Sequence, residues 1–356
     1  MNVLLTSVGR RSYLVEYFKA AVGPGGQVIC ANSRDSAPAR RAADHFHLVP
    51  ESCAPGDVDA IKALCVAHDV RALFSCHDLD TCVLSRRQME LAGLPLTAFL
   101  PSPEWNEATL DKLLTYRTLS RHGIACPWIT DDPAEARARM EAAQACGRDY
   151  PIVLKARFGF GSLGLRHCTR PEDLFSAHAE ARAEVEHSSF FSSVAQLQLG
   201  QSTVVLQERV AGRELCLDVV NDLSGRHLTT LATEVHAMRA GESDTATTLP
   251  VEGALADLGR QVSALTRHRG IWGVDCIERE GVLHVLDLNP RFTGDYPFSH
   301  LAGANIPRAL LALVAGDPPR PEDLVCRSGV SGYKDLVPRL CSPAPAEPLT
   351  LKELAA

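Results

Sequence analysis

The sequence lacks the features of a membrane protein and of a nucleic-acid-binding protein. No apolar run approaches the roughly 20 residues that cross a bilayer. The formal net charge is −7, and the arginine pairs Arg10–Arg11 and Arg40–Arg41 are isolated, which is typical of surface arginines rather than of a basic stripe. Hydrophobic residues make up 46% and charged residues 22% of the 356 residues. We therefore expect a soluble globular protein with no membrane and no nucleic-acid partner.

The twelve cysteines contain no C-x-x-C pair. Most of them lie in apolar runs, where a cysteine behaves as a small buried hydrophobe. This pattern argues against a zinc site and against a disulfide framework, and it indicates a reducing compartment. A strand pattern begins within residues 1–7 with no charged leader before it, so we predict a cytoplasmic protein.

The first hundred residues alternate between strand and helix patterns, which is typical of a small parallel sheet. The predicted strands are residues 3–6, 28–31 and 72–75, and the predicted helices are residues 12–21, 57–67 and 79–92. A Rossmann fingerprint is missing after the first strand, which excludes a typical dinucleotide site. Pro101 and Pro103 mark the end of this domain.

A glycine-rich loop follows the strand pattern of residues 150–158, with glycines at Gly159, Gly161 and Gly164. A Rossmann loop would open a helix, but a strand pattern follows here, and a kinase loop would precede its lysine, but Lys155 comes first. No Walker A sequence is present. The loop is therefore either a plain structural turn or a hairpin tip that closes over a triphosphate, with Lys155 supplying positive charge.

Residues 204–219 predict a strand, a short link containing Gly212, and a second strand. Glutamates on strand edges are commonly solvated. Because the link joins two sets of strands, Glu208, Val210 and Glu214 are also candidates for an interlobe nucleotide pocket.

The strongest pattern is a predicted β-hairpin formed by residues 271–278 and 282–288. The period-two alternation of a strand places Asp287, Asn289 and Arg291 on one face. A three-residue loop centred on Gly281 also places Asp275 directly opposite Asp287.

Directly opposed like charges weaken a sheet, so a bound cation is the natural explanation for this pair. Oxygen ligands select Mg²⁺, with Mn²⁺ as the alternative. A surface hairpin with spare acids is the other interpretation, but the apolar neighbours Val274, Val285 and Leu288 favour a buried hairpin.

Two segments are candidates for substrate binding. Residues 236–248 predict a polar loop near the cleft, in which Arg239 either pairs with a substrate carboxylate or is an ordinary exposed arginine. Residues 77–80 follow a strand, where open α/β sheets present ligand-facing groups, and are a candidate site for an amine substrate.

Taken in order along the chain, these motifs resemble the ATP-grasp superfamily. The resemblance extends in particular to its single-copy members, which are similar to the large subunit of carbamoyl phosphate synthetase. It is carried by Lys112, Lys155 with the glycine loop, Gln207-Glu208 followed by Gly212 and Glu214, then Asp275 and Asp287-x-Asn289-Pro290-Arg291. It implies an N-terminal parallel-sheet α/β domain (residues 1–105), a two-lobed α+β ATP-grasp domain (106–325, with lobes 106–210 and 211–325) and a C-terminal extension (326–356).

The resemblance also implies a role for each matching residue. Lys112 and Lys155 contact ATP phosphates with the loop residues Gly161, Ser162 and Gly164, Glu208 and the Val210 backbone meet the adenine, and Glu214 holds the ribose. Asp275, Asp287 and Asn289 bind Mg²⁺, and Arg291, Arg239 and Lys155 are the expected catalytic residues. The family more often has Glu where Asp287 stands, so the metal distances are expected to differ.

Such enzymes phosphorylate a carboxylate with ATP, and an amine then attacks the acyl phosphate to give an amide. We therefore expect a ligase of small-molecule carboxylates and amines, with amino acids as the leading candidates and with homo-oligomerisation left open. A carbamate- or bicarbonate-phosphorylating enzyme and a non-catalytic nucleotide-binding module are the alternatives.

Overall fold

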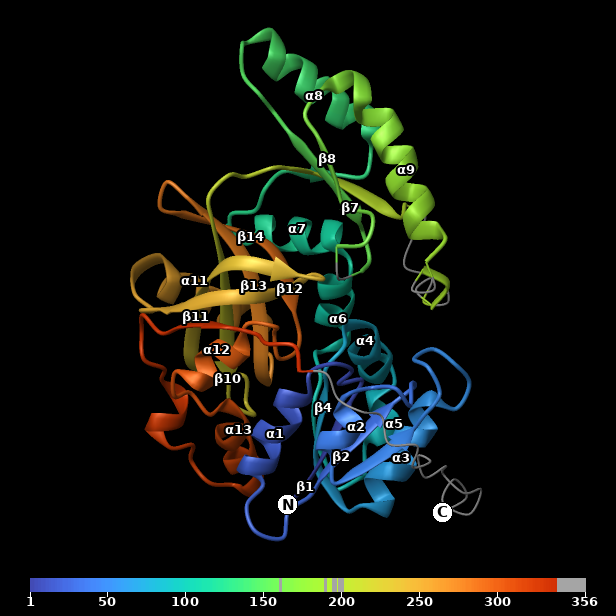
Figure 1. The fold of residues 1–356 in the computed structure, drawn as a ribbon, viewed down its shortest axis with the longest axis vertical. Helices are drawn as coiled ribbons and strands as arrows, with labels where there is room; N and C mark the ends of the chain where they lie inside the picture. Colours follow the sequence, from blue (N-terminus) through green and yellow to red (C-terminus); the bar gives the residue numbers. More distant parts are fainter. Residues whose placement is uncertain (160–161, 189–190, 194–196, 198–201, 338–356) are drawn as a thin grey trace.

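The computed structural model describes residues 1–159, 162–188, 191–193, 197 and 202–337, and it arranges them around three β-sheets (Figure 1). The parallel sheet at the N-terminus, a small antiparallel sheet and a large antiparallel sheet follow one another along the chain. This order confirms the predicted fold class. No helix within these described ranges combines the length and apolar character needed to cross a bilayer.

The N-terminal sheet has five parallel strands in the order β3-β2-β1-β4-β5. Its strands are β1 (Asn2–Thr6), β2 (Val28–Asn32), β3 (His45–Leu48), β4 (Val70–Ser75) and β5 (Thr97–Phe99), and its helices are α1 (Ser12–Ala21), α2 (Ala39–Ala42), α3 (Asp57–Ala67), α4 (Asp78–Arg86) and α5 (Gln88–Leu91). The sequence patterns miss the short elements α2, β3 and β5, and they merge α4 with α5. Short elements carry too few periodic positions to stand out.

The small lobe is built on a four-stranded antiparallel sheet in the order β6-β9-β7-β8. Its elements are α6 (Pro103–Leu110), α7 (Lys112–Arg121), β6 (Ile129–Thr130), α8 (Pro133–Ala145), β7 (Ile152–Ala156), β8 (Arg166–Cys168), α9 (Leu174–Glu186) and β9 (Val204–Glu208). Helices α8 and α9 lie together on one side of this sheet (Figure 1).

The large sheet is antiparallel, in the order β14-β13-β10-β11-β12-β15. Its strands are β10 (Arg213–Asn221), β11 (His227–Arg239), β12 (Glu242–Leu249), β13 (Gly270–Arg279), β14 (Val282–Asn289) and β15 (Ser331–Tyr333), and its helices are α11 (Gly253–Thr266), α12 (Tyr296–Leu301) and α13 (Ile306–Ala315). One hydrophobic core joins this part to the N-terminal sheet, with Phe18 and Phe74 packing against Phe292.

The β13–β14 hairpin reaches the predicted register by a different route. Its turn has two residues, Glu280 and Gly281, both with positive φ, rather than the predicted three. A register shift next to Asp275 compensates, because Asp275 pairs with Asp287 while its neighbour Cys276 pairs with Val285. The two aspartates therefore face each other as predicted.

The predicted polar loop over residues 236–248 is wrong, because most of this segment belongs to strands β11 and β12. The strands pair with each other and turn at Ala240 and Gly241, which both have positive φ. Thr245, Thr247 and Thr248 are β-branched and suit a strand, so polarity alone misled the prediction.

Gly259 tests how closely α11 packs on the large sheet. A Cβ at this position would lie 2.1 Å from Thr230 Oγ1 in β11. Alanine favours a helix over glycine by about 1 kcal/mol, but we expect Gly259→Ala to lower the free energy of unfolding by about 1–3 kcal/mol because of overpacking. Chemical denaturation measures the effect. Adding Thr230→Ala should restore most of the loss, and a single variant more stable than the parent protein would contradict the packing.

Candidate active site

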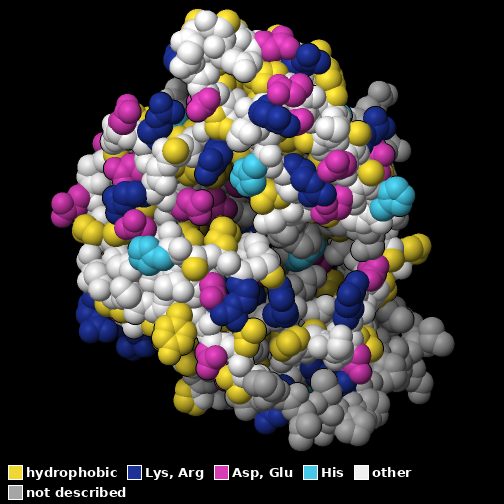
Figure 2. All heavy atoms as spheres, turned by 45° about the horizontal axis from the view of Figure 1, so that its top comes forward, with side chains coloured by type: hydrophobic (Ala, Val, Ile, Leu, Met, Phe, Trp, Pro, Cys, Tyr) yellow, Lys and Arg dark blue, Asp and Glu magenta, His cyan; other side chains and the backbone are white. Residues whose placement is uncertain are grey.

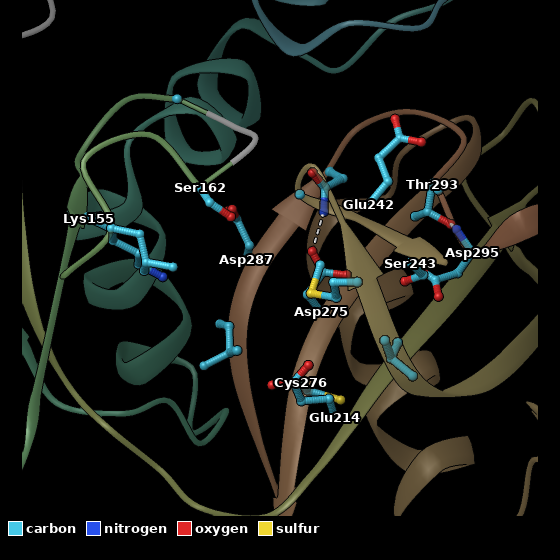
Figure 3. Close-up of a pocket in the computed structure, with 18 of the residues that line it drawn as sticks. Lys155, Ser162, Glu214, Glu242, Ser243, Asp275, Cys276, Asp287, Thr293 and Asp295 are labelled. Carbon is cyan, nitrogen blue, oxygen red and sulfur yellow. Dashed lines mark hydrogen bonds between the residues drawn. The ribbon is translucent and has the colours of Figure 1, made fainter. Parts of the chain in front are cut away.

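A cavity of about 310 Å³ lies between the small lobe and the large sheet and reaches the N-terminal domain (Figure 3). Acidic and basic side chains are intermixed around the hollowed part of the face seen in Figure 2. Among the predicted site residues, those that line the cavity are Lys112, Lys155, Ser162, Glu214, Asp275, Asp287, Asn289 and Arg291.

The opposed acids of the hairpin form one wall of the cavity. Asn289 Nδ2 donates a hydrogen bond to Asp275 Oδ2 at 2.8 Å. Burial and, to a smaller extent, the carboxylates of Asp295 and Asp287 together raise the pKa of Asp275 to about 6, although the hydrogen bond from Asn289 opposes the shift. Carboxylates that repel one another in a buried oxygen-rich wall fit a divalent cation such as Mg²⁺. Asp275, Asp287 and Asn289 would hold it.

Two lysines of the small lobe face these acids. Lys112 Nζ lies 3.2 Å from Asp287 Oδ2 and donates to the carbonyl of Gly159 at 2.7 Å. Burial and the neighbouring charge of Lys112 together lower the pKa of Lys155 to about 8, although Asp287 and Asp275 oppose the shift. Two ammonium groups beside a cation site form a setting suited to phosphate oxygens.

A buried network fixes the position of Lys112 at the start of α7. Asp111 caps the helix by accepting from the backbone N–H groups of Leu113 and Leu114. The same carboxylate accepts two hydrogen bonds from Arg157, at 2.9 and 2.7 Å, just after β7. Lys112 and Lys155 are thereby held on one rigid unit.

The glycine loop is only partly described. Ser162 has a φ of 63° and lines the cavity with Leu163. The Gly164 N–H donates to Glu184 Oε1 at 3.1 Å, and a Cβ at this position would lie 2.7 Å from Val185 Cγ2. Packing against α9 therefore explains Gly164. Gly161 lies outside the described residues.

Only one of the three residues predicted to contact the nucleoside lines the cavity. Glu214 lines the cavity, but Glu208 and Val210 are not among its lining residues. Glu208 Oε2 accepts from the Tyr150 hydroxyl at 3.1 Å, and the Val210 side chain is buried. Their contact with an adenine stays a prediction.

Arg291 forms a buried ion pair with the N-terminal domain. Its Nε and Nη2 donate to the two carboxylate oxygens of Asp78 in α4, both at 2.9 Å, and Nη2 also donates to Asn289 Oδ1 at 3.0 Å. Burial alone would raise the pKa of Asp78, but Arg291 holds it below its ordinary value. The guanidinium is therefore fixed and charged beside the cation ligands.

This pair changes the hypothesis for residues 77–80. Asp78 binds Arg291, and Asp80 accepts hydrogen bonds from the Thr6, Ser52 and Ser75 hydroxyls. Both carboxylates are thus engaged within the protein, and binding of an amine substrate by this segment stays a hypothesis.

The sequence predicted Arg239 near the cleft and Arg11 at the surface, but the structure has the opposite arrangement. Arg239 is exposed, pairs with Asp244 at 2.7 Å and is not among the lining residues. Arg11, interpreted above as a surface arginine, lines the cavity with a side chain only 12% exposed, and its Nη2 lies 2.9 Å from Glu242 Oε1. Its place just beyond the carboxyl end of β1 was the available signal.

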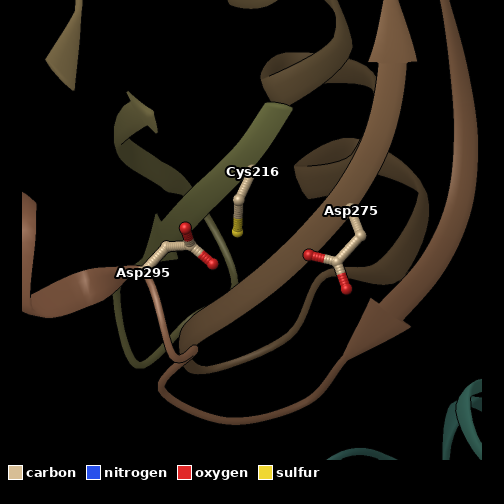
Figure 4. A group of neighbouring side chains, drawn as sticks. All are labelled: Cys216, Asp275 and Asp295. Atoms are coloured by element: carbon tan, nitrogen blue, oxygen red, sulfur yellow. The ribbon is translucent and has the colours of Figure 1, made fainter. Parts of the chain in front are cut away.

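Cys216 lies among acids behind the cation site (Figure 4). Its Sγ and carboxylate oxygens of Asp275 and Asp295 lie within 4.8 Å of one another. Burial raises the pKa of Cys216 well above its ordinary value, and the nearby acids add to the effect. The sulfur is therefore a neutral thiol that can donate to a carboxylate, a role that the prediction of a merely apolar cysteine misses.

Two lobes with antiparallel sheets enclose a cavity that is lined by lysines and by opposed acids. Residues 109–295, more than half of the chain, match the sequence model of the ATP-grasp domain, and residues 3–96 match that of the PylC-like N-terminal domain. The chain belongs to the ATP-grasp family.

More distant likenesses cover parts of much larger proteins. The chain is 26% identical over 225 residues to an acetyl-CoA carboxylase of Dictyostelium discoideum and 24% identical over 217 residues to a carbamoyl phosphate synthase large chain of Deinococcus deserti. These alignments cover 60% and 58% of the chain but only 9% and 19% of the two relatives.

A solved structure shares the fold over most of the chain. It is the biotin carboxylase domain dimer of Hydrogenobacter thermophilus 2-oxoglutarate carboxylase, in complex with MgADP, ADP and bicarbonate. The TM-score is 0.69 at 18% identity, over 91% of this chain and 72% of that one.

Removing one of the opposed carboxylates tests the cation site. We expect Asp287→Ala to reduce ATP-dependent turnover by more than about 100-fold, because loss of second-shell partners alone reduces metal affinity or activity by about 10–100-fold. Asp287→Glu should keep measurable turnover because it keeps a carboxylate. The exposed Asp257→Ala is the control, and circular dichroism checks folding. Unchanged turnover in Asp287→Ala would rule out the site.

The Arg291–Asp78 pair makes a separate prediction. We expect Asp78→Asn to lower kcat by about 10-fold or more with a smaller effect on the KM for ATP, because Arg291 loses its bidentate partner. The free energy of unfolding should also fall, since a buried charge is left without its ion-pair partner. Steady-state kinetics and denaturation measure the two effects, with exposed Asp59→Asn as the control. A wild-type kcat in Asp78→Asn would contradict the positioning role.

Proposed function

We propose that the protein is an ATP-dependent carboxylate–amine ligase that joins small molecules, with amino acids as the substrates, through an acyl phosphate. The observation that carries the proposal is the order of charges along one cavity. Lys112 and Lys155 stand on one side of the opposed acids, and the fixed guanidinium of Arg291 stands on the other.

The proposed reaction has two steps. In the first, a substrate carboxylate oxygen attacks the γ-phosphorus of ATP, the bond to the β,γ-bridging oxygen breaks, and ADP leaves. In the second, an amine nitrogen attacks the acyl carbon, the bond from that carbon to the phosphate oxygen breaks, and phosphate leaves with the electron pair. The nitrogen loses its proton to solvent, which completes the amide.

The chain's own side chains position and neutralise these groups. Lys112 and Lys155 would hold the phosphates together with Ser162, and Glu214, which lines the same cavity, would meet the ribose. Arg291 neutralises the charge of the acyl phosphate from its fixed position. Asp275, Asp287 and Asn289 would hold a Mg²⁺ or Mn²⁺ ion, which would supply charge neutralisation for the phosphates.

Phosphorylation of bicarbonate is the second candidate, supported by the likeness to carboxylases and by the bicarbonate in the Hydrogenobacter structure. The PylC-like N-terminal domain favours amino-acid ligation instead. We also propose unit boundaries near residues 105 and 325, although β15 beyond the second boundary pairs with β12 of the large sheet. Homo-oligomerisation stays open.

An assay with paired substrates separates these functions. The protein with Mg-ATP is given pools of amino acids and small carboxylates, alone and in combination, and phosphate release is followed together with product mass. We expect release to require a carboxylate and an amine together and to yield a product at the mass of an amide. Release with bicarbonate alone would favour the second candidate, and nucleotide binding without substrate-dependent release would exclude both.

A further inference from the structure

The cavity extends past the cation site to a second group of polar lining residues, and we call this end of the cavity the second compartment. Figure 3 shows Glu242, Ser243, Thr293 and Asp295 on the side of Asp275 that faces away from Lys155. Three parts of the chain meet there. They are the N-terminal domain with Arg11, the start of β12 with Glu242, and the segment after β15 with Lys334.

Glu242 links the two cations of this compartment. Arg11 Nη2 lies 2.9 Å from Oε1, and Lys334 Nζ lies 3.5 Å from Oε2. Burial raises the pKa of Glu242, but Arg11 and Lys334 together hold it below its ordinary value, so the side chain is a carboxylate. Arg11 is also engaged with the protein backbone, because its Nη1 donates to the carbonyls of Cys76 and Phe292.

Lys334 retains donor capacity. Its contact with Glu242 is long for a hydrogen bond, and its ammonium lies 5.7 and 6.0 Å from the ring centroids of Tyr13 and Phe298. An ammonium has three N–H donors, so this arrangement leaves room for an anionic partner. The side chain is only 20% exposed, so an ion pair with such a partner contributes more binding free energy than it would at the surface.

The Lys334 ammonium lies next to Gly294, a residue of the cavity wall. Gly294 lines the cavity, and a Cβ at this position would lie only 3.5 Å from Lys334 Nζ. The next residue, Asp295, is buried and also lines the cavity. Glu242 and Asp295 therefore line the space beyond the cation site, and the Lys334 ammonium, which is not itself among the lining residues, lies next to Gly294 in its wall.

We propose that this compartment binds the amine substrate, which is an amino acid with a free carboxylate. The substrate carboxylate pairs with Lys334, and Asp295 and Glu242 accept hydrogen bonds from the N–H groups of the amine. The inference rests on the proposed ligase function and adds the residues that recognise the free carboxylate of the amine substrate. The amine nitrogen then points back toward Arg291 and the cation ligands, where the acyl phosphate is made. An amine without a carboxylate would leave Lys334 partly buried and poorly paired.

Matched amides test the proposal on the wild-type protein. Each of the twenty proteinogenic amino acids and its α-carboxamide is offered as the amine, with Mg-ATP and the carboxylate found active in the paired assay. We expect kcat/KM to be about 10- to 100-fold higher for the free acid than for its amide, mainly through KM, because the amide lacks the charge that pairs with Lys334.

Variants then attribute the preference to Lys334. We expect Lys334→Met to bring the acid-to-amide ratio close to one, and Lys334→Arg to restore much of it, because arginine keeps the charge. Lys62→Met, which removes an exposed lysine of α3, should leave the ratio unchanged. Thermal denaturation checks that each variant folds. If Lys334→Met does not fold, the acid-to-amide ratio of the wild-type protein still tests the proposal.

The outcomes separate the two proposals. Equal use of free acids and amides by the wild-type protein, or an undiminished preference in folded Lys334→Met, would overturn the assignment of Lys334 and leave the ligase function standing. A wild-type protein that releases phosphate with no combination of carboxylate and amine would instead overturn the ligase function, and this inference with it.

Discussion

The site is organised around two carboxylates that face each other across neighbouring strands. Asp275 and Asp287 repel one another in a place where burial already disfavours charge, and such a pair persists only where positive charge is supplied. The surrounding structure supplies it from separate elements. Lys112 and Lys155 come from the small lobe, and Arg291 follows directly on the hairpin. The cavity between the lobes exists where these charges meet, and its oxygen-rich wall leaves a place for a divalent ion.

The N-terminal domain is a wall of the site as well as a preceding unit. Asp78 fixes Arg291 through two hydrogen bonds, and Arg11 reaches Glu242 on the large sheet. The aromatic contacts of Phe292 with Phe18 and Phe74 continue the same junction beneath these ion pairs. Buried ion pairs need close and well-formed geometry, and a shared apolar core supplies the rigidity that keeps it. The parallel sheet therefore positions two arginines on which the proposed chemistry depends.

Local periodicity predicted what depends on one or two strands, and it failed where distant segments meet. The alternation of the strand placed Asp287 and Asn289 on one face, and a three-residue loop was assumed in order to place Asp275 opposite Asp287. The structure reaches the same register through a two-residue turn and a bulge, which were not visible in the pattern. The β11–β12 hairpin was missed because its threonines are polar and β-branched at once. The Arg291–Asp78 pair joins residues 213 positions apart, and a single sequence carries no signal for such a contact.

The distribution of charge along the cavity also fits the three reactants of the proposed reaction. The end near Lys155 is basic and matches a triphosphate, whereas the end near Glu242 mixes cations with acids and matches a zwitterion. The opposed acids and Arg291 lie between them, where the carboxyl group that reacts with both partners must stand. An acyl phosphate is lost if water reaches it first, so a buried middle flanked by two binding regions favours transfer to the amine over hydrolysis. In the proposed reaction, the repulsion between two aspartates thus fixes where the phosphate is received and the side from which the amine arrives.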